Sequence, residues 1–201
     1  RAAAVMGQLR SAVRAYARLD LRPALVLESL DGVVRDLDEN QIVTCIYAVY
    51  DAGERSLVWA NAGHLPPVVS YPDGPAATMA GAASPPLGAG PVAVAEHRVT
   101  LPVGAVVALY TDGLVERRRL ELDAGVEMLV RQLEQASGHL PGMLHAVVDA
   151  VLQVAPDDDV AVLLARSLRT SCSSSTSSST TPSSTASRRS RSGCGSPTTN
   201  W

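Results

Sequence analysis

Residues 106–119, "VVALYTDGLVERRR", combine a buried-strand pattern with a possible metal ligand, so the inference of both fold and function starts from them. An apolar run leads into Tyr110, an Asp-Gly pair follows at Asp112 and Gly113, and charged residues come next. An apolar run of this length favours a buried β-strand over residues 105–110. Asp-Gly is a common turn pair, but a carboxylate at the end of a buried strand can also bind a metal. Both interpretations of Asp112 stay open at this point.

A second group of carboxylates stands before the last apolar run of the chain. Asp157, Asp158 and Asp159 precede "VAVLLAR", and a strand is predicted over residues 159–166. If the two strands are antiparallel neighbours, Asp112 and these acids converge at one sheet edge. Clustered carboxylates repel one another unless a cation neutralises them, and oxygen ligands suit Mg²⁺ or Mn²⁺. The alternative is a solvated loop whose acids cap backbone N–H groups.

The chain before this point begins with two predicted helices. Apolar residues recur at helical spacing in the first helix, within residues 2–19. Pro23 suits the first turn of the second helix. The apolar stripe of that helix is Leu27, Leu30, Val34 and Leu37.

Strands and two further helices complete the predicted domain. Residues 42–50 and 57–62 form a hairpin, and the other predicted elements are strands at 66–71, 92–100, 105–110 and 159–166 and helices at 123–136 and 141–153. The nearly continuous apolar run of the last strand predicts a central position in its sheet. This order indicates an α+β layered domain over residues 1–166.

Composition excludes several classes of protein. The chain has 201 residues, enough for one domain and a tail, and its net charge of −3 gives no reason to expect a nucleic-acid partner. No apolar run approaches the roughly 20 residues that cross a bilayer, and the start lacks a secretory signal. A cytoplasmic protein without a membrane partner is expected. With 3% aromatic residues and no Phe, its core must consist of Val, Leu and Ala.

The tail and the cysteines carry little information about function. Residues 167–201 are rich in Ser and Thr and are predicted to be disordered. Cys172 and Cys194 lie in this tail, whereas Cys45 stands among apolar residues and is expected in the core. No disulfide framework is predicted.

Four segments together resemble a known family. "LYTDGLVERR" and "DDDVAVLLAR", preceded by "NAGHLPPVV" and "SPPLGAG", resemble the SpoIIE-like branch of the PPM-type metal-dependent protein phosphatases. The resemblance implies a two-sheet β-sandwich flanked by helices. It also implies hydrolysis of phosphoserine or phosphothreonine by a water that bridges two Mn²⁺ or Mg²⁺ ions. The implied substrate is a phosphorylated regulatory protein, such as an anti-anti-sigma factor.

The resemblance also assigns site residues. The metal ligand in the family's "DG" pair matches Asp112, and its late ligand best matches Asp158. The triple acid leaves this register uncertain by one, so Asp159 is a further candidate and Asp157 a reserve. No catalytic residue is expected beyond the metal ligands. His64 in "NAGH" is expected to have a structural role, either in a turn or in packing.

The family element "GDVxGHG" would stand just before the helix that starts here as "AAAVMGQL". It supplies the Asp that bridges the two metals, so the resemblance implies an N-terminally truncated domain that is poorly active alone. A sensor domain could precede it in a full-length version. The alternatives are a non-catalytic module that binds a phosphoprotein, and an unrelated α+β domain whose acids serve turns. The opening helices, residues 1–38, either act as a switch or simply cover the sheet.

Overall fold

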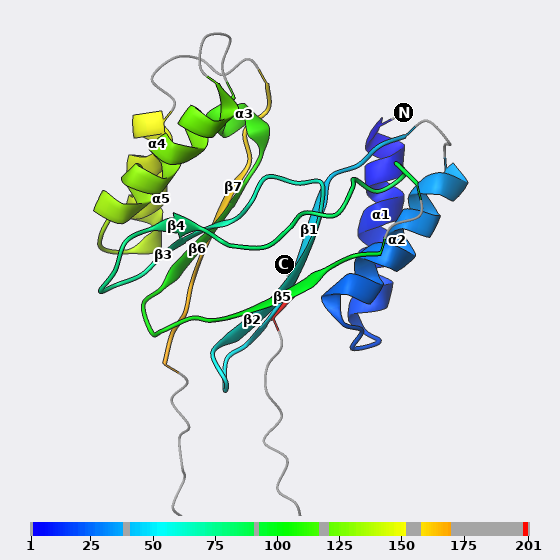
Figure 1. Ribbon diagram of the computed structural model, residues 1–201, viewed down its shortest axis with the longest axis horizontal. Coiled ribbons are helices and arrows are strands. Elements are labelled where there is room, and N and C mark those ends of the chain that lie inside the picture. Colours follow the sequence, from blue (N-terminus) through cyan, green and yellow to red (C-terminus); the bar gives the residue numbers. More distant parts are fainter. Residues whose placement is uncertain are drawn as a thin grey trace, which may run out of the picture.

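A computed structural model describes residues 2–37, 41–90, 93–116, 121–151, 158–169 and 199–200, with the backbone alone at residues 2–3 and 199–200. These residues form two four-stranded sheets. A pair of helices lies outside each sheet (Figure 1). The predicted α+β layered sandwich is confirmed.

The first sheet is built on the predicted hairpin. β1 (Cys45–Asp51) and β2 (Ser56–Ala62) are antiparallel, with Cys45 opposite Ala62. β5 (Glu96–Thr100) pairs with the other edge of β2, and β8 (Thr199–Asn200) pairs with β1. Residues 170–198, most of the tail predicted to be disordered, lie outside the described residues, as do Cys172 and Cys194.

The second sheet has the order β4-β3-β6-β7, with every pair antiparallel. Its strands are β3 (Val68–Ser70), β4 (Ala77–Thr78), β6 (Val106–Tyr110) and β7 (Val162–Arg166). Among the described residues β7 pairs with β6 alone, so the predicted central position is wrong. Both faces of this edge strand nevertheless carry apolar contacts, although Leu163 is 36% exposed. Val162 and Leu164 pack under the helices, and Leu163 and Ala165 face the first sheet. A continuous apolar run thus indicates apolar contacts on both faces of a strand and does not indicate how many strands pair with it.

The two helix pairs cover the outer faces of the sheets. α1 (Ala2–Ala17) packs on α2 (Pro23–Leu37), and α2 lies against β1 and β2. The predicted stripe is buried at Leu27, Leu30 and Val34. On the other side, α4 (Leu122–Gln135) and α5 (Leu140–Val151) bury Leu129, Leu133 and Val147 over the second sheet.

A buried carboxylate fixes the long loop between β4 and β5 to α2. Asp31 is 2% exposed and forms an ion pair with Arg35 at 2.9 Å. It also accepts a hydrogen bond from the N–H of Gly88 at 2.8 Å. Glu28, one turn earlier, accepts another from the N–H of Val94 at 3.2 Å. The acids of α2 therefore hold the loop in place.

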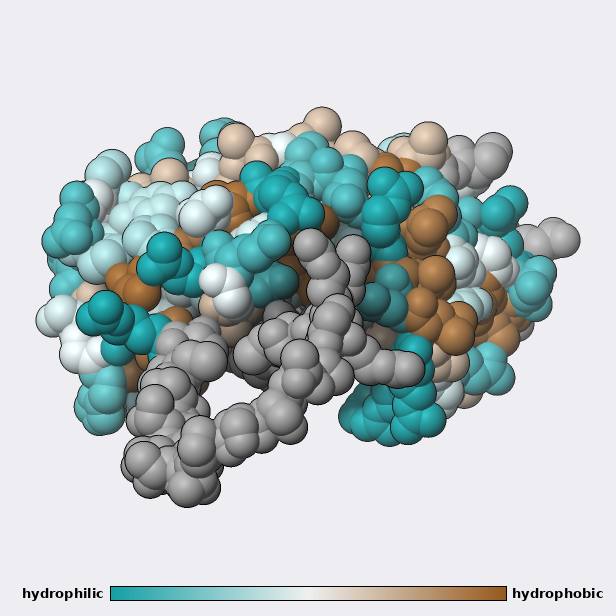
Figure 2. All heavy atoms as spheres, turned by 90° about the horizontal axis from the view of Figure 1, so that it is seen from below, coloured by the Kyte–Doolittle hydropathy of each residue, from teal (hydrophilic) through white to brown (hydrophobic). Residues whose placement is uncertain are grey.

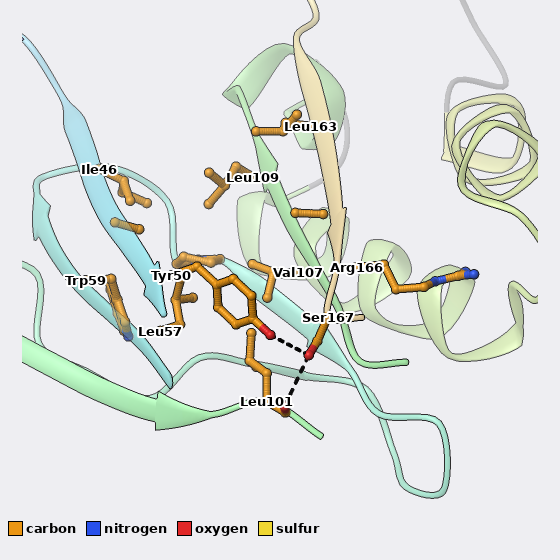
Figure 3. A pocket seen from close by; sticks show the side chains of 13 residues that line it. Ile46, Tyr50, Leu57, Trp59, Leu101, Val107, Leu109, Leu163, Arg166 and Ser167 are labelled. Carbon is orange, nitrogen blue, oxygen red and sulfur yellow. Dashed lines mark hydrogen bonds between the residues drawn. The ribbon is translucent and has the colours of Figure 1, made fainter. Parts of the chain in front are cut away.

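The sheets face one another across an apolar layer. Figure 3 shows a cavity in this layer, lined by side chains such as Trp59, Leu109 and Leu163. Its volume is about 60 Å³. At one end Ser167 donates a hydrogen bond to the carbonyl of Leu101 at 3.3 Å, and its oxygen lies 2.7 Å from the Tyr50 hydroxyl. Because the single hydroxyl proton of Ser167 is used, Tyr50 is the donor of the second bond.

The outer surface is mixed in character. Figure 2 shows hydrophobic residues at the surface on the side of the molecule where α1 and α2 lie. Among the helices in the described residues, none is both long enough and apolar enough to span a bilayer.

Candidate metal centre

The end of β6 lies beside the start of β7. Tyr110 stands opposite Val162 in the antiparallel register, and the N–H of Thr111 continues the pairing to the carbonyl of Ala161 at 3.0 Å. The two acidic segments therefore come to the same sheet edge. The structure thus confirms that these two strands are antiparallel neighbours.

The side chain of Thr111 joins the two segments a second time. Its hydroxyl accepts a hydrogen bond from the N–H of Ala161 at 2.9 Å and donates one to the carbonyl of Asp159 at 3.2 Å. Sequence analysis did not identify Thr111 as a residue of this site. The available signal was a hydroxyl residue placed directly between a buried strand and an Asp-Gly pair, where it can both donate and accept.

Gly113 permits the closest approach of the backbones. A Cβ atom added at Gly113 would lie 2.6 Å from the carbonyl oxygen of Asp159 and 3.1 Å from that of Asp158. The Asp-Gly pair begins a short helix, α3 (Asp112–Val115). Glycine is therefore required here by contact with the second acidic segment.

Asp112 and Asp158 each use only one carboxylate oxygen in a hydrogen bond with the described residues. Asp112 Oδ1 accepts the N–H of Gly113 at 2.9 Å, and Asp158 Oδ1 accepts the N–H of Asp159 at 2.7 Å. The second carboxylate oxygen of each accepts no hydrogen bond from the described residues. Asp112, Asp158 and Asp159 are all exposed. These oxygens can therefore reach a hydrated cation.

The donor set fits a hard divalent ion. Mg²⁺ keeps several waters and is commonly bound through one or two carboxylates, which is what Asp112 and Asp158 offer. Within the part of the chain that the structure describes, no three or more His, Cys, Asp or Glu side chains are grouped to hold a metal. Asp157 lies outside the described residues. The described residues thus provide two neighbouring acidic segments and not a complete ligand shell.

His64 lies in the turn that follows β2. The side chain of Asn61 accepts the N–H of His64 at 2.8 Å and donates to its carbonyl at 2.8 Å. Gly63, with φ +68°, completes this turn. His64 therefore has the turn role expected from the sequence.

Two groups, the buried Tyr110 and the partly buried Cys45, keep their protons near neutral pH. The Tyr110 hydroxyl, at the end of β6, donates to the carbonyl of Pro66 at 3.0 Å, and burial raises the pKa of Tyr110 to about 12. Burial likewise raises the pKa of the Cys45 thiol to about 11, so it is not a reactive thiolate near neutral pH. Both groups serve packing.

The chain is similar in sequence to a known family and in fold to several solved structures. Residues 1–168 match the family described as Stage II sporulation protein E (SpoIIE). A structure of the RsbU and RsbW domains of a Mycobacterium tuberculosis protein is similar with a TM-score of 0.76 and 27% identity. The match covers 84% of this chain and 49% of that one, so this chain spans about half the length of that relative.

Two further structures share the fold. The SiaA PP2C domain of Pseudomonas aeruginosa has a TM-score of 0.68 and 20% identity, over 82% of this chain and 68% of that one. The catalytic domain of the serine/threonine protein phosphatase PstP, solved with two manganese ions, has a TM-score of 0.59 and 14% identity, with 80% of each chain covered. The acidic sheet edge thus occurs in a fold that elsewhere holds divalent metals.

Proposed function

Because this chain belongs to the SpoIIE family of PP2C-type serine/threonine phosphatases, we propose that it is a metal-dependent phosphoprotein phosphatase domain in which Asp112 and Asp158 hold a divalent cation. The proposed domain covers residues 1–166. One observation carries the proposal: Gly113 lies against the backbone of Asp158 and Asp159, so the two acidic segments adjoin.

Each residue of the edge has a defined task in this proposal. Asp112 and Asp158 each offer one oxygen to Mn²⁺ or Mg²⁺, with Asp159 as the alternative in the second segment. Thr111 and Gly113 keep the two backbones together, so that the carboxylates share one cation. A divalent cation, when bound, lowers the pKa of a coordinated water and neutralises phosphate charge.

The proposed substrate is a phosphoserine or phosphothreonine in a cytoplasmic regulatory protein of the anti-anti-sigma type. Its support is the likeness to a Mycobacterium tuberculosis protein that carries RsbU and RsbW domains. The fold supplies the chemistry, whereas the surface around the acidic edge would select the partner.

A second candidate is a module that binds a phosphoprotein without hydrolysing it. One observation favours it: the described residues contain no group of three or more metal-ligating side chains. An incomplete ligand shell would bind a cation and a phosphate without positioning a water for attack. The two candidates differ in turnover and agree in metal-dependent binding.

Metal binding and turnover test the two candidates together. Binding of Mn²⁺ is followed by electron paramagnetic resonance, and phosphate release from a phosphoserine peptide is followed in the presence of Mn²⁺. We expect D112N and D158N to weaken Mn²⁺ binding at least tenfold and to abolish phosphate release. D73N is the matched control, because Asp73 is exposed and distant in sequence from both segments.

The results separate the outcomes. Unchanged Mn²⁺ binding in D112N and D158N would contradict the proposed metal site. Metal-dependent binding of the phosphopeptide without phosphate release would replace the enzyme with the binding module.

A further inference from the structure

The guanidinium of Arg166 lies at the end of β7 and is held in place by the segment around the start of α5. Its Nη2 donates a hydrogen bond to the carbonyl of Gly138 at 2.6 Å and lies 2.8 Å from Sδ of Met143. Figure 3 shows this side chain pointing away from the cavity between the sheets and toward the helices. The two contacts of Nη2 therefore define the position of the guanidinium.

The other two nitrogens of Arg166 have no partner among the described residues. Nε is buried and forms no hydrogen bond. Nη1 forms none either, and it is not buried. No carboxylate of a described residue forms an ion pair with this guanidinium. A partly buried cation without a counter-charge is unfavourable, so the surroundings of Arg166 favour an anion beside it.

Arg166 lines a crevice between the second sheet and the link from α4 to α5. The volume of the crevice is about 310 Å³, which lies within the range of small-molecule sites. Tyr71, Pro72 and Val106 supply apolar parts of its wall, and the exposed Ser137 adds a hydroxyl. All lining segments, and the residues on either side of each, belong to the described part of the chain.

A charge of the opposite sign lines the same crevice. Glu134, near the end of α4, is exposed and forms no ion pair with Arg166 or with another described residue. Among the described residues, Glu134 and Arg166 are the charged side chains of the lining. The crevice therefore offers one positive group, one negative group and an apolar wall, and its two charges do not neutralise each other by direct contact.

We propose that this crevice binds a small zwitterion, namely an α-amino acid with an apolar side chain. The ligand carboxylate accepts a hydrogen bond from Nη1 of Arg166, its ammonium group faces Glu134, and its side chain lies on the apolar wall. Arginine suits carboxylates, and hydrogen bonds between charged groups are the stronger ones.

The proposed amino-acid site is separate from the acidic sheet edge. Arg166 stands opposite Val106 at one end of the β6–β7 pair, whereas Tyr110 and Val162 stand opposite each other at the end beside the acids. Binding in the crevice therefore requires neither a metal nor catalysis.

The pair of charges disfavours ligands of a single sign. A phosphate ion in the crevice would be attracted by Arg166 and repelled by the carboxylate of Glu134, and a simple amine would meet the reverse. A zwitterion satisfies both groups at once.

The test uses the full chain and three probes of matched shape. L-Leucine carries both charges, 4-methylpentanoate lacks the ammonium group, and 3-methylbutylamine lacks the carboxylate. Titrations are followed by ¹H–¹⁵N NMR at the Nε–H of Arg166 and the amide of Gly138. We expect saturable shifts with leucine and binding of 3-methylbutylamine that is at least about tenfold weaker. Because Glu134 is exposed, 4-methylpentanoate should bind about two- to fivefold more weakly than leucine.

Variants assign the two charges. R166M should abolish binding of leucine, and E134Q should bind leucine and 4-methylpentanoate equally. R131M is the matched control, since Arg131 is an exposed arginine of α4 that does not line the crevice, and it should bind leucine as the parent chain does. Thermal unfolding by circular dichroism checks that each variant is folded. E134Q replaces only an exposed side chain, so it tests the proposal even if R166M is unstable.

Several results would overturn the proposal. They are the absence of saturable shifts with leucine, equal binding of the three probes, and inorganic phosphate binding as tightly as leucine. An undiminished preference for leucine over 4-methylpentanoate in E134Q, or equal losses in R131M and R166M, would do the same.

Discussion

The hydroxyl of Thr111 binds the N–H of Ala161 at 2.9 Å and joins two segments that are 50 residues apart in the chain. The same hydroxyl reaches the carbonyl of Asp159 at 3.2 Å. Backbone pairing between β6 and β7 ends at this point, so the Thr111 side chain extends the contact into the acidic segments. The spacing of Asp112 and Asp158 thus depends on a residue that carries no charge.

Replacing Thr111 with Val tests how the two Thr111 hydrogen bonds affect stability and Mn²⁺ binding without removing a carboxylate. The variant keeps the shape of the side chain and loses both hydrogen bonds, which should cost about 1–2 kcal/mol of unfolding free energy. Mn²⁺ affinity should fall as well, although no carboxylate is removed. Urea unfolding and Mn²⁺ titration measure the two effects. T111S restores the hydroxyl and should recover both, and a T111S variant as weak as T111V would contradict the assigned role.

Gly113 gives a second test of the same contact. In G113A the new methyl group would lie 2.6 Å from the carbonyl oxygen of Asp159, which forces the acidic segments apart. We expect a loss of about 1–3 kcal/mol in unfolding free energy and weaker Mn²⁺ binding. In the control, G32A, nothing lies within 4 Å of the new methyl in α2, and the variant should gain about 0.5–1 kcal/mol. Equal changes in the two variants would argue against a close contact at Gly113.

Much of the arrangement around this contact follows from the sequence. The periodicity of α1 and α2 and the β1–β2 hairpin match the predictions. The antiparallel pairing of β6 with β7 meets the condition under which the sequence places the two acidic segments at one sheet edge. Each of these elements has a strong local signal, either an apolar stripe at helical spacing or an apolar run ended by turn residues. Local signals of this kind depend on few other parts of the chain.

The features that were missed depend on contacts between distant segments. The edge position of β7 could not be predicted, because the layers on its two faces make it as apolar as a central strand. α3 replaces a simple Asp-Gly turn, since the backbone after Asp112 packs on residues 158–159. β4 is two residues long and has no sequence pattern of its own. Metal binding by Asp112, Asp158 and Asp159 stays a prediction.

Removing the buried carboxylate of Asp31 should lower the unfolding free energy more than removing the exposed carboxylate of Asp36 on the same helix. D31A leaves the N–H of Gly88 and the guanidinium of Arg35 without their shared partner. Because Asp31 is 2% exposed, we expect a loss of about 2–4 kcal/mol in unfolding free energy. D36A, at an exposed position of the same helix, should change it by less than about 0.5 kcal/mol. Urea unfolding compares the two, and a D31A variant as stable as D36A would show that Asp31 does not fix the loop.

The buried hydroxyl of Tyr110 predicts a loss of stability at alkaline pH. Burial raises its pKa to about 12 in the folded chain, whereas an unfolded tyrosine titrates near pH 10. Below about pH 10 both states keep the proton, so the contribution of Tyr110 to stability is fully present. Between about pH 10 and 12 the unfolded state loses its proton first, and unfolding free energy falls by up to about 1.4 kcal/mol per pH unit from this group.

The variant Y110F isolates this contribution from the other groups that titrate in the same range, of which Cys45 is one. It lacks the hydrogen bond to Pro66 and should be less stable than the parent chain at pH 8. Its stability should then decline less steeply between pH 10 and 11, so that the difference between the two proteins narrows as the pH rises. Urea unfolding at pH 8, 10 and 11 measures both slopes. Parallel slopes would mean that Tyr110 titrates alike in the folded and unfolded chains, and that its hydroxyl is not enclosed at the end of β6.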